Sequence, residues 1–595
     1  MYIIEVVPIA KIPLPSSQVL TYFTSQRPSD GSLVLVPLKK KEVPAIVLSQ
    51  KRADEAKMEI KKAKFKLRPV LKVIEEKPII FNYQIEVAKW ISRYYWASLG
   101  KTMSLFLPTP LLKKLVKNNI RKQTLFELKN PVKKTIRRPS SKLYIAPFGS
   151  LPDKEIKITL KQKKQVLFLI PEKSRNVFWT KKIKQTISQE GQNFYNFCFF
   201  STGLPSNKYL ENFEKIKEDK VKIVIGTRSA LFAPFVNLGL IVLLEAANKN
   251  YKSEMEPRYN AKKVAEKLVS ILGINLVFVS SLPLIEDYVR SRKIDRIEQK
   301  VQKVEKKIID MKSLQRISRA NVLEQWSPLS PFLLNEIKKY ISLKKKIVLF
   351  INRKGEGLSV VCQDCGWIKK CRNCEVPLIL RRGGNQKNPS MICCHCGFES
   401  LPPQQCEKCQ SWRLITLGSG IEKVEGEIRK SLKGLKVLRL DSETAPKRST
   451  QNKIIKNFLG GEESVLIATS LIFRYFPTLL DKKMPLVGII SMDSLLSLPD
   501  FKNEEEGIKI VHNLLSLTSN KFIFQTFWPD SQVASFIRSG YNYFFKKVID
   551  ERKRLLYPPF SKIIKLTFSH RDIKKVQSKA YDLVERLKRQ VTIFN

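Results

Sequence analysis

Short, almost continuous apolar runs alternate with polar, helix-like segments through the middle of the chain. They form two successive sets: residues 166–171, 221–226, 239–244 and 274–279, and residues 346–351, 435–440, 464–468 and 486–490. Runs of this kind are typical of parallel strands that are buried on both faces of a sheet and connected by helices. The pattern predicts two α/β lobes. The first covers residues 142–290, and the second covers residues 331–361 and 411–540, with the block 362–410 inserted.

Other patterns flank the two lobes. Residues 32–37 and 45–48 are rich in β-forming side chains, and residues 81–95 show helical apolar spacing. Together they predict a small, mostly β domain over residues 1–108. The charged segment 291–330 predicts a helical connector between the lobes.

Basic residues outnumber acidic residues two to one, with 108 Lys and Arg against 54 Asp and Glu and a net charge of +54. Such an excess favours a polyanion as the partner, through phosphate contacts and counterion release. Residues 113–138 hold ten basic residues and one acid, which indicates a basic linker over 109–141. This linker either spaces two domains or contacts nucleic acid. No run approaches the roughly 20 apolar residues of a membrane span, so we expect no membrane partner.

Nine of the ten cysteines fall between residues 362 and 409, and eight of them form four C-x-x-C pairs. The pairs are Cys362/Cys365, Cys371/Cys374, Cys393/Cys396 and Cys406/Cys409. A structural zinc ion needs four ligands in a tetrahedron, and C-x-x-C supplies two of them from one knuckle, so four pairs predict two zinc ions. A disulfide cluster would require a secreted chain, and residues 1–5 show no export signal. We therefore expect a zinc protein of the cytoplasm, with Cys198 and Cys394 outside the ligand set.

Several strings along the chain carry a resemblance to one family. They are GTRSALFAPF at 226–235, NLGLI at 237–241, NRKG at 352–355, the C-x-x-C series at 362–409, GSGIE at 418–422, LPDF at 498–501 and YPPF at 557–560. In these strings the chain resembles the primosomal protein N′ (PriA) family of bacterial replication-restart DNA helicases. The resemblance runs collinearly from about residue 3 to the end. It implies an α/β multidomain fold: two RecA-like lobes of helicase superfamily 2, a double zinc module in the second lobe, an N-terminal DNA-binding domain and an abbreviated α+β C-terminal domain at 541–595.

The same resemblance implies functional residues and partners. It pairs the cysteines in a nested way, so that Cys362, Cys365, Cys406 and Cys409 hold one zinc ion and Cys371, Cys374, Cys393 and Cys396 hold the other. It places Arg228, Tyr251, Arg258 and Tyr259 as candidates for DNA contact. Its implied partners are forked or branched DNA, primosome proteins and the replicative helicase, in a bacterial cytoplasm and in association with the nucleoid.

The nucleotide motifs of the family are damaged in this chain. The phosphate-binding loop G-x-x-G-S-G-K-T corresponds to APFGSLPD at 146–153, where only Gly149 and Ser150 remain, and D-E-E-H corresponds to LEAA at 244–247, where only Glu245 remains. Three further motifs have also changed: SSLP at 280–283, ATSLIFRY at 468–475, and SLTSN at 516–520 in place of the arginine-bearing G-R-A-G-R. Phosphoryl transfer needs a phosphate cradle, a held metal ion and cations that face the γ-phosphate. ATP and Mg²⁺ are therefore not expected as cofactors, and no residue is assigned a catalytic role.

Two other departures bear on DNA recognition. The family's winged-helix insertion is reduced to the basic stretch 109–141, and its Phe-Asp pair that reads a DNA 3′ end aligns with Leu20–Thr21. Our interpretation is a DNA-binding replication-restart protein that recognises stalled forks and helps load the replicative helicase without ATP-driven unwinding. One alternative is an active ATP-dependent 3′-to-5′ helicase. Another is a zinc-dependent RNA- or ribosome-binding protein on the same fold.

Overall fold

The chain forms two compact units, Met1–Gly540 and Tyr541–Asn595. The structure is a computed structural model. It describes all residues except 15, 56–66, 118–140, 189–195, 292, 297–303, 314–326, 353–358, 363, 366, 374–376, 382–389, 394–395, 418–420, 433, 462–464, 497–500, 565, 567, 569–571 and 591–595. Within the described residues, none of the helices has the length and apolar character that a bilayer crossing requires. Most of the basic linker, residues 118–140, lies outside the described residues.

A six-stranded sheet forms the N-terminal part of the first unit. In pairing order its strands are β5 (Arg68–Pro69), β2 (Leu20–Thr24), β1 (Tyr2–Pro8), β4 (Lys41–Arg52), β3 (Leu33–Leu38) and β6 (Lys72–Glu75). Ile4 and Val6 of β1 lie two positions apart and share one apolar core, as the alternation of side chains along a strand requires. Three helices follow: α2 (Asn82–Tyr94), α3 (Leu99–Met103) and α4 (Thr109–Lys117). The helix expected at 81–95 is confirmed by α2.

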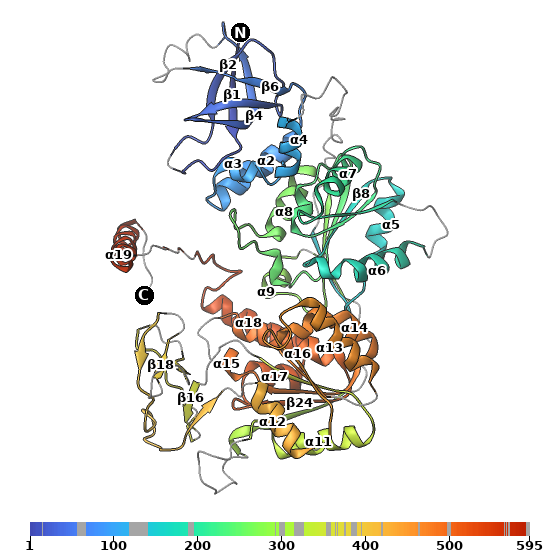
Figure 1. The fold of residues 1–595 in the computed structure, drawn as a ribbon, viewed down its shortest axis with the longest axis vertical. Helices are drawn as coiled ribbons and strands as arrows, with labels where there is room; N and C mark the ends of the chain where they lie inside the picture. The colour runs from blue at the N-terminus through green and yellow to red at the C-terminus, as the bar shows by residue number, and fades with distance from the viewer. Residues whose placement is uncertain are drawn as a thin grey trace. The chain divides into compact units, whose positions relative to one another are not determined.

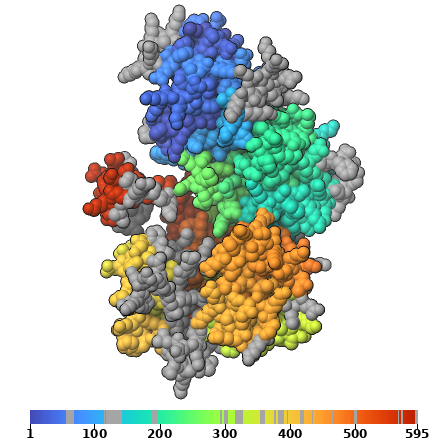
Figure 2. All heavy atoms as spheres, viewed as in Figure 1, coloured from blue at the N-terminus to red at the C-terminus, as the bar shows by residue number. Residues whose placement is uncertain are grey.

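Helix α2 joins this domain to the first lobe. The Tyr83 hydroxyl donates a hydrogen bond of 3.0 Å to the Phe235 carbonyl, and the Gln84 amide donates one of 3.3 Å to the Phe232 carbonyl. The blue N-terminal domain accordingly lies against the green first lobe (Figures 1 and 2). Both residues of α2 are buried, so the two parts share a packed interface.

The first lobe is a seven-stranded sheet in which every pair of neighbouring strands is parallel. The pairing order is β13 (Lys293–Arg296), β7 (Ser141–Ile145), β12 (Asn275–Ser280), β11 (Leu238–Leu243), β8 (Gln165–Leu169), β10 (Ile223–Gly226) and β9 (Phe197–Phe200). Its helices are α5 (Asp153–Lys161), α6 (Asn176–Ser188), α7 (Ser206–Lys217), α8 (Ala261–Leu272) and α9 (Ile285–Arg290), with 3₁₀ turns η1 (Lys173–Arg175), η2 (Arg228–Phe232) and η3 (Lys249–Tyr251). Every residue of β8, β10 and β11 is buried, which confirms the two-sided burial predicted from the apolar runs.

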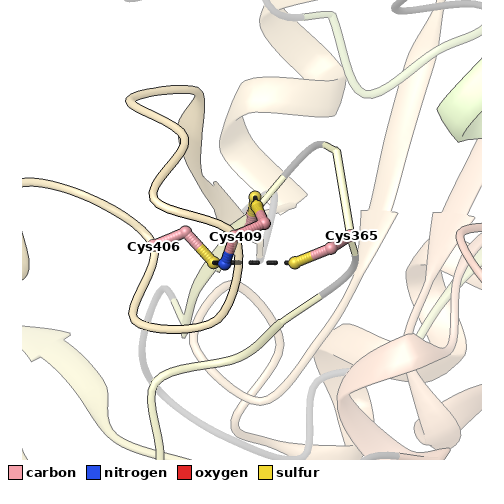
Figure 3. Close-up of side chains that lie close together, drawn as sticks. Cys365, Cys406 and Cys409 are labelled. Carbon is pink, nitrogen blue, oxygen red and sulfur yellow. Dashed lines mark hydrogen bonds between the residues drawn. The ribbon is translucent and has the colours of Figure 1, made fainter.

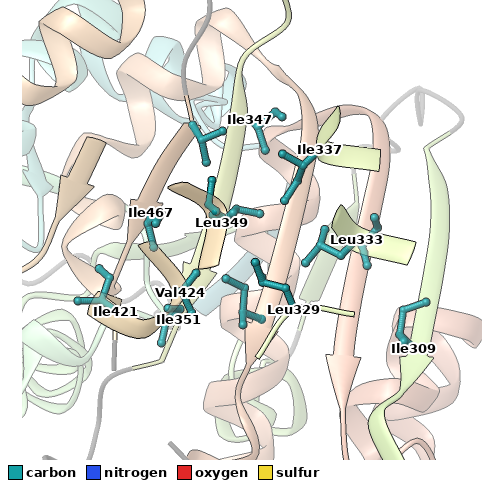
Figure 4. Packing of buried hydrophobic residues seen from close by; sticks show 14 of the residues in the cluster. Ile309, Leu329, Leu333, Ile337, Ile347, Leu349, Ile351, Ile421, Val424 and Ile467 are labelled. Carbon is teal, nitrogen blue, oxygen red and sulfur yellow. The ribbon is translucent and has the colours of Figure 1, made fainter. Parts of the chain in front are cut away.

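The second lobe is a six-stranded, all-parallel sheet. The pairing order is β14 (Glu305–Asp310), β24 (Thr518–Thr526), β23 (Met484–Ser491), β15 (Ile347–Ile351), β22 (Val465–Ala468) and β21 (Val437–Leu440). Its helices are α11 (Pro331–Ser342), α12 (Ile421–Ser431), α13 (Arg448–Gly460), α14 (Phe476–Lys482), α15 (Asp493–Leu496), α16 (Asn503–Leu517) and α17 (Gln532–Ser539), with the 3₁₀ turn η4 (Ser470–Tyr475). Side chains of α11 and α12, such as Leu333 and Val424, pack with Leu349 of β15 in one core (Figure 4).

The helical connector predicted over 291–330 is wrong for two segments that the structure describes there, although residues 311–313 are helical. Lys293–Arg296 forms β13 at the edge of the first sheet, and Glu305–Asp310 forms β14 at the edge of the second sheet. The second sheet therefore begins in the sequence before β15. Charged residues are tolerated in both strands because an edge strand exposes one side to solvent.

The inserted module and the second unit are small. The module contains the pair β16 (Ser359–Cys362) and β20 (Leu414–Leu417), and the three-stranded sheet β17 (Ile379–Arg381), β18 (Ser390–Ile392) and β19 (Glu399–Ser400). The second unit contains α18 (Tyr541–Arg554) and α19 (Ile573–Gln590). The strands expected in this unit are not found among its described residues.

Candidate metal centres and nucleotide cleft

Four cysteines from the first and last C-x-x-C pairs meet in one cluster. The Sγ atoms of Cys362 and Cys409 lie 3.6 Å apart, those of Cys365 and Cys406 lie 3.5 Å apart, and all four lie within 4.8 Å of one another. Figure 3 shows the sulfurs of Cys365 and Cys406 turned toward each other. Four ligands at about 2.3 Å from a zinc ion would have sulfurs about 3.8 Å apart, whereas a disulfide needs about 2.05 Å. The cluster therefore has the dimensions of a metal site and not of disulfides.

A second cluster brings together Cys371, Cys393 and Cys396. The sulfurs of Cys371 and Cys396 lie 3.5 Å apart. Cys374, the fourth predicted ligand, lies outside the described residues, as do Cys394 and His395. Cys371 and Cys393 are buried in a small apolar core with Leu378 and Met391, which holds this knuckle to the β17–β19 sheet.

Backbone geometry favours the thiolate form at Cys406. The N–H groups of Lys408 and Cys409 each donate to its Sγ at 3.4 Å. Burial raises the pKa of this thiol, but these donors and the neighbouring cysteines outweigh burial and lower the pKa to about 7. The thiolate is the form that binds metal, so the knuckle is arranged for a ligand role.

The segment that corresponds to the phosphate-binding loop connects β7 to α5. Gly149 keeps a left-handed backbone with φ of +94°, but Leu151 is buried in the apolar core of the first lobe. Pro152 occupies the N-cap position of α5 and Asp153 is the first residue of the helix, so a carboxylate lies where the helix N-terminus would attract a phosphate. Lys154 is exposed and does not line the cavity described below. A triphosphate does not fit this loop, because its cation and hydroxyl are missing and an acid stands at the helix start.

Aromatic rings fill the space beside this loop. The Phe148 ring stacks on Phe178 at a centroid distance of 5.2 Å and approaches Trp179 at 5.4 Å. A methyl group on Gly149 would come within 3.3 Å of the Phe178 ring. The loop is therefore packed against α6 on this side, while its residues 146–149 also line the cavity described below.

Glu245, the remaining acid of the second nucleotide motif, is bound by other side chains. The Trp179 indole N–H donates to its Oε1 at 3.0 Å, and the Arg175 Nε lies 3.4 Å from the same oxygen. Burial raises the pKa of Glu245 above its ordinary value, while Arg175 and the Trp179 hydrogen bond oppose this shift. The carboxylate is thus committed to internal contacts that a general base or a magnesium ligand would have to break.

A cavity of about 250 Å³ lies between the two lobes beside these residues. The first lobe contributes Phe148, Arg175 and Glu245 to its wall, and the second lobe contributes Phe473 and Lys509. The positions that correspond to the family's two arginines do not line it. Leu517 is fully buried in the core, and Asn520 is exposed in β24.

The four candidates for DNA contact differ in accessibility. The Tyr251 ring is buried, and its hydroxyl donates to the carbonyls of Leu169 and Leu244 at 2.8 and 2.6 Å. Tyr259 is buried as well, and burial raises its pKa. Arg228 donates to the Asn250 carbonyl at 2.9 Å, so it braces the same loop. Arg258 is the member of this set whose side chain is exposed.

Sequence reasoning missed Arg175, Trp179 and Lys509. None of them lies in a string that carried the resemblance, and the sequence of a charged segment such as 172–175 does not reveal which of its residues is buried. The signal that could have pointed to this region is indirect. Glu245 survives in a motif that has otherwise been lost, and an isolated acid in an apolar setting needs a partner.

Residues 10–108 match the family described as 3'DNA-binding domain (3'BD) of PriA. Proteins named "Replication restart protein PriA" align over most of the chain. The one from Borreliella burgdorferi is 27% identical over 89% of this chain and 81% of its own length, and the one from Helicobacter pylori is 26% identical over 96% and 87%. The one from Rickettsia conorii is 27% identical over 97% and 89%.

Among solved structures, RecG bound to a three-way DNA junction aligns over 89% of this chain and 52% of that chain, at 9% identity and a TM-score of 0.36. That value is too low to bear on function. The sequence relatives are a stronger finding, because they are collinear with this chain from its N-terminal domain through both lobes. The chain is thus similar over most of its length to proteins named replication restart protein PriA, and its N-terminal domain matches the 3'DNA-binding domain of PriA.

Proposed function

We propose that this chain is a DNA-binding replication-restart protein that recognises forked DNA and supports loading of the replicative helicase without ATP-driven unwinding. DNA binding is supported by the 3'DNA-binding domain match at 10–108 and by the net charge of +54. The proposal places its action on the chromosome, in the cytoplasm of a bacterium. Its primosome partners are inferred from the family alone.

The loss of unwinding is carried by one observation, the occupation of Glu245 by Arg175 and Trp179. An acid in this motif normally serves the metal ion and the attacking water of phosphoryl transfer. Here the Glu245 carboxylate contacts the side chains of Arg175 and Trp179. The loop that corresponds to the phosphate-binding loop ends in Pro152 and Asp153, where the family has a lysine followed by a hydroxyl residue. Among the described residues, Glu245 and the 146–153 loop thus do not offer the metal ligand, the lysine and the hydroxyl that hydrolysis uses.

Two zinc ions are part of this proposal. The first would be held by Cys362, Cys365, Cys406 and Cys409. The second would be held by Cys371, Cys393 and Cys396 with Cys374, which the family resemblance supplies. Zinc in such thiolate sites contributes folding energy and not catalysis, so the module would serve DNA or partner contact.

The proposal is tested by fluorescence anisotropy with forked DNA, duplex DNA and structured RNA, beside an ATPase assay with forked DNA. We expect preference for the fork, weak dependence on base sequence and no ATP hydrolysis. DNA-stimulated hydrolysis would support the active helicase, and tighter binding to RNA would support the RNA-binding alternative. Arg258→Ala should reduce the slope of log affinity against log salt by about 1, as removal of one phosphate-binding cation does. Arg290→Ala, which removes another exposed arginine of the first lobe, is the matched control.

A further inference from the structure

Direct contacts between side chains and backbone of the two lobes surround the cavity, all within the unit Met1–Gly540. The Arg175 Nη2 donates to the Phe473 carbonyl at 2.6 Å, and the Phe148 ring meets the edge of the Phe476 ring at 5.0 Å. These two contacts lie side by side, because Arg175 also lies over the Phe148 ring at 5.7 Å. The lobes therefore touch each other directly beside the cavity.

Helix α16 of the second lobe makes a second set of contacts. The Lys509 Nζ donates to the Ala247 carbonyl at 2.7 Å, and the Glu505 carboxylate accepts a hydrogen bond of 3.0 Å from the Ile285 N–H. Glu505 and Lys509 are four residues apart, so they lie on one face of the helix. This face contacts two segments of the first lobe: the segment after β11, at Ala247, and the start of α9, at Ile285.

Arg175 connects the two sets. It is 5% exposed, its Nε lies 3.4 Å from Glu245, and its Nη2 reaches across to the second lobe. A buried guanidinium is tolerated only where an opposite charge and acceptors compensate it. Glu245 supplies that charge from the first lobe, and Phe473 supplies an acceptor from the second, so the guanidinium has both partners only when the lobes are together.

We propose that the chain itself holds its two lobes closed, through Arg175, and that closure needs no nucleotide. Domain closure around a ligand is normally driven by contacts that the ligand makes with both sides. Here Arg175 of the first lobe contacts both Glu245 of its own lobe and Phe473 of the second lobe, in place of a ligand. The cavity lies beside these contacts. This inference goes beyond the proposed function, since a protein that bound no DNA could be clamped in the same way.

The Ile285 N–H is a reporter of closure that lies apart from Arg175. Its acceptor is Glu505 of the other lobe, and as the first residue of α9 it has no acceptor within its own helix. Its hydrogen exchange, followed by mass spectrometry of peptides spanning 282–290, should therefore be slow only while the lobes are together. In the unmodified protein we expect slow exchange that ATP analogues with Mg²⁺ leave unchanged.

Arg175→Gln removes the charge and should speed exchange at Ile285 by about 10- to 100-fold, as expected for loss of a hydrogen bond to a charged group. Arg474→Gln is the matched control. Arg474 lines the same cavity but donates at 2.7 Å to Gln451 of its own lobe, so its loss should leave Ile285 unchanged. Unchanged exchange at Ile285 in a folded Arg175→Gln protein would overturn the proposal. So would protection of Ile285 by nucleotide in the unmodified protein, a measurement that needs no substitution.

Discussion

Restoring the family's phosphate-binding loop should destabilise this protein and should not restore ATP hydrolysis. The change is Leu151→Gly, Pro152→Lys and Asp153→Thr together, which writes G-K-T at 151–153. Leu151 is 5% exposed and packs in the core of the first lobe with Ile156 and Trp179. The position that should face a phosphate is thus held by a core side chain.

The expected cost follows from the burial of Leu151. Removing a buried leucine side chain typically costs about 2–5 kcal/mol, and glycine adds backbone freedom to the unfolded chain. A loss of 2–5 kcal/mol corresponds to an increase of about 30- to 5,000-fold in the opening of the first lobe. Hydrogen exchange of the amides of β8, at the centre of this sheet, measures that opening directly.

Leu401→Gly is a suitable control, because Leu401 is 75% exposed. Its effect should stay within about 0.5 kcal/mol, as for most surface substitutions. The triple variant should remain inactive toward ATP with forked DNA, because Glu245 would still be bound by Trp179 and Arg175. An active triple variant, or one whose β8 amides exchange at the original rate, would refute the reasoning that the loop has become part of the core.

Three further predictions concern zinc, salt and pH. Elemental analysis should find two zinc ions per chain, and Cys406→Ser should release zinc and unfold the module. Cys198→Ser, which replaces a buried thiol of β9, is the control and should keep both ions. Deleting 113–138 should make the salt dependence of DNA binding shallower, by about 0.9 in log–log slope for each phosphate that the segment neutralises, and an unchanged slope would identify the segment as a spacer. Burial lowers the pKa of His512 in α16 to about 4, so its contribution to stability is complete above about pH 6.5 and is lost as the pH falls toward 4. Urea unfolding between pH 7 and 4 should show a smaller loss of stability in His512→Leu, and equal losses in both proteins would contradict this assignment.

The sequence predicted those parts of the fold whose pattern is set by burial. Strand β8 is buried along its whole length, and all of it after Gln165 belongs to one apolar run in the sequence. Helix α2 buries Ile85, Val87, Ala88 and Ile91 at helical spacing. The edge strands β13 and β14 escaped prediction, because lysine and aspartate on an open edge erase the apolar signal. A strand of this kind is defined by its neighbour in the sheet and not by its own residues.

The candidate sites divide in the same way. Metal-binding cysteines have a local signature, and the structure brings Cys362 and Cys409 together across 47 positions of sequence. The contact of Arg175 with Phe473 spans 298 positions and uses a backbone carbonyl, which any residue could provide. Neither the sequence around Arg175 nor the sequence around Phe473 indicates such a contact. Only the folded structure reveals that the two residues are in contact.

The environment of Glu245 bears on how this position evolves. Without the carboxylate, the buried Arg175 guanidinium would lose its opposite charge and the Trp179 indole N–H would lose its acceptor. Selection for folding alone would therefore retain a glutamate here, even in descendants that never hydrolyse a nucleotide. A glutamate at this position is then explained by the stability of the fold. Its presence in a related chain is not by itself evidence that the chain hydrolyses ATP.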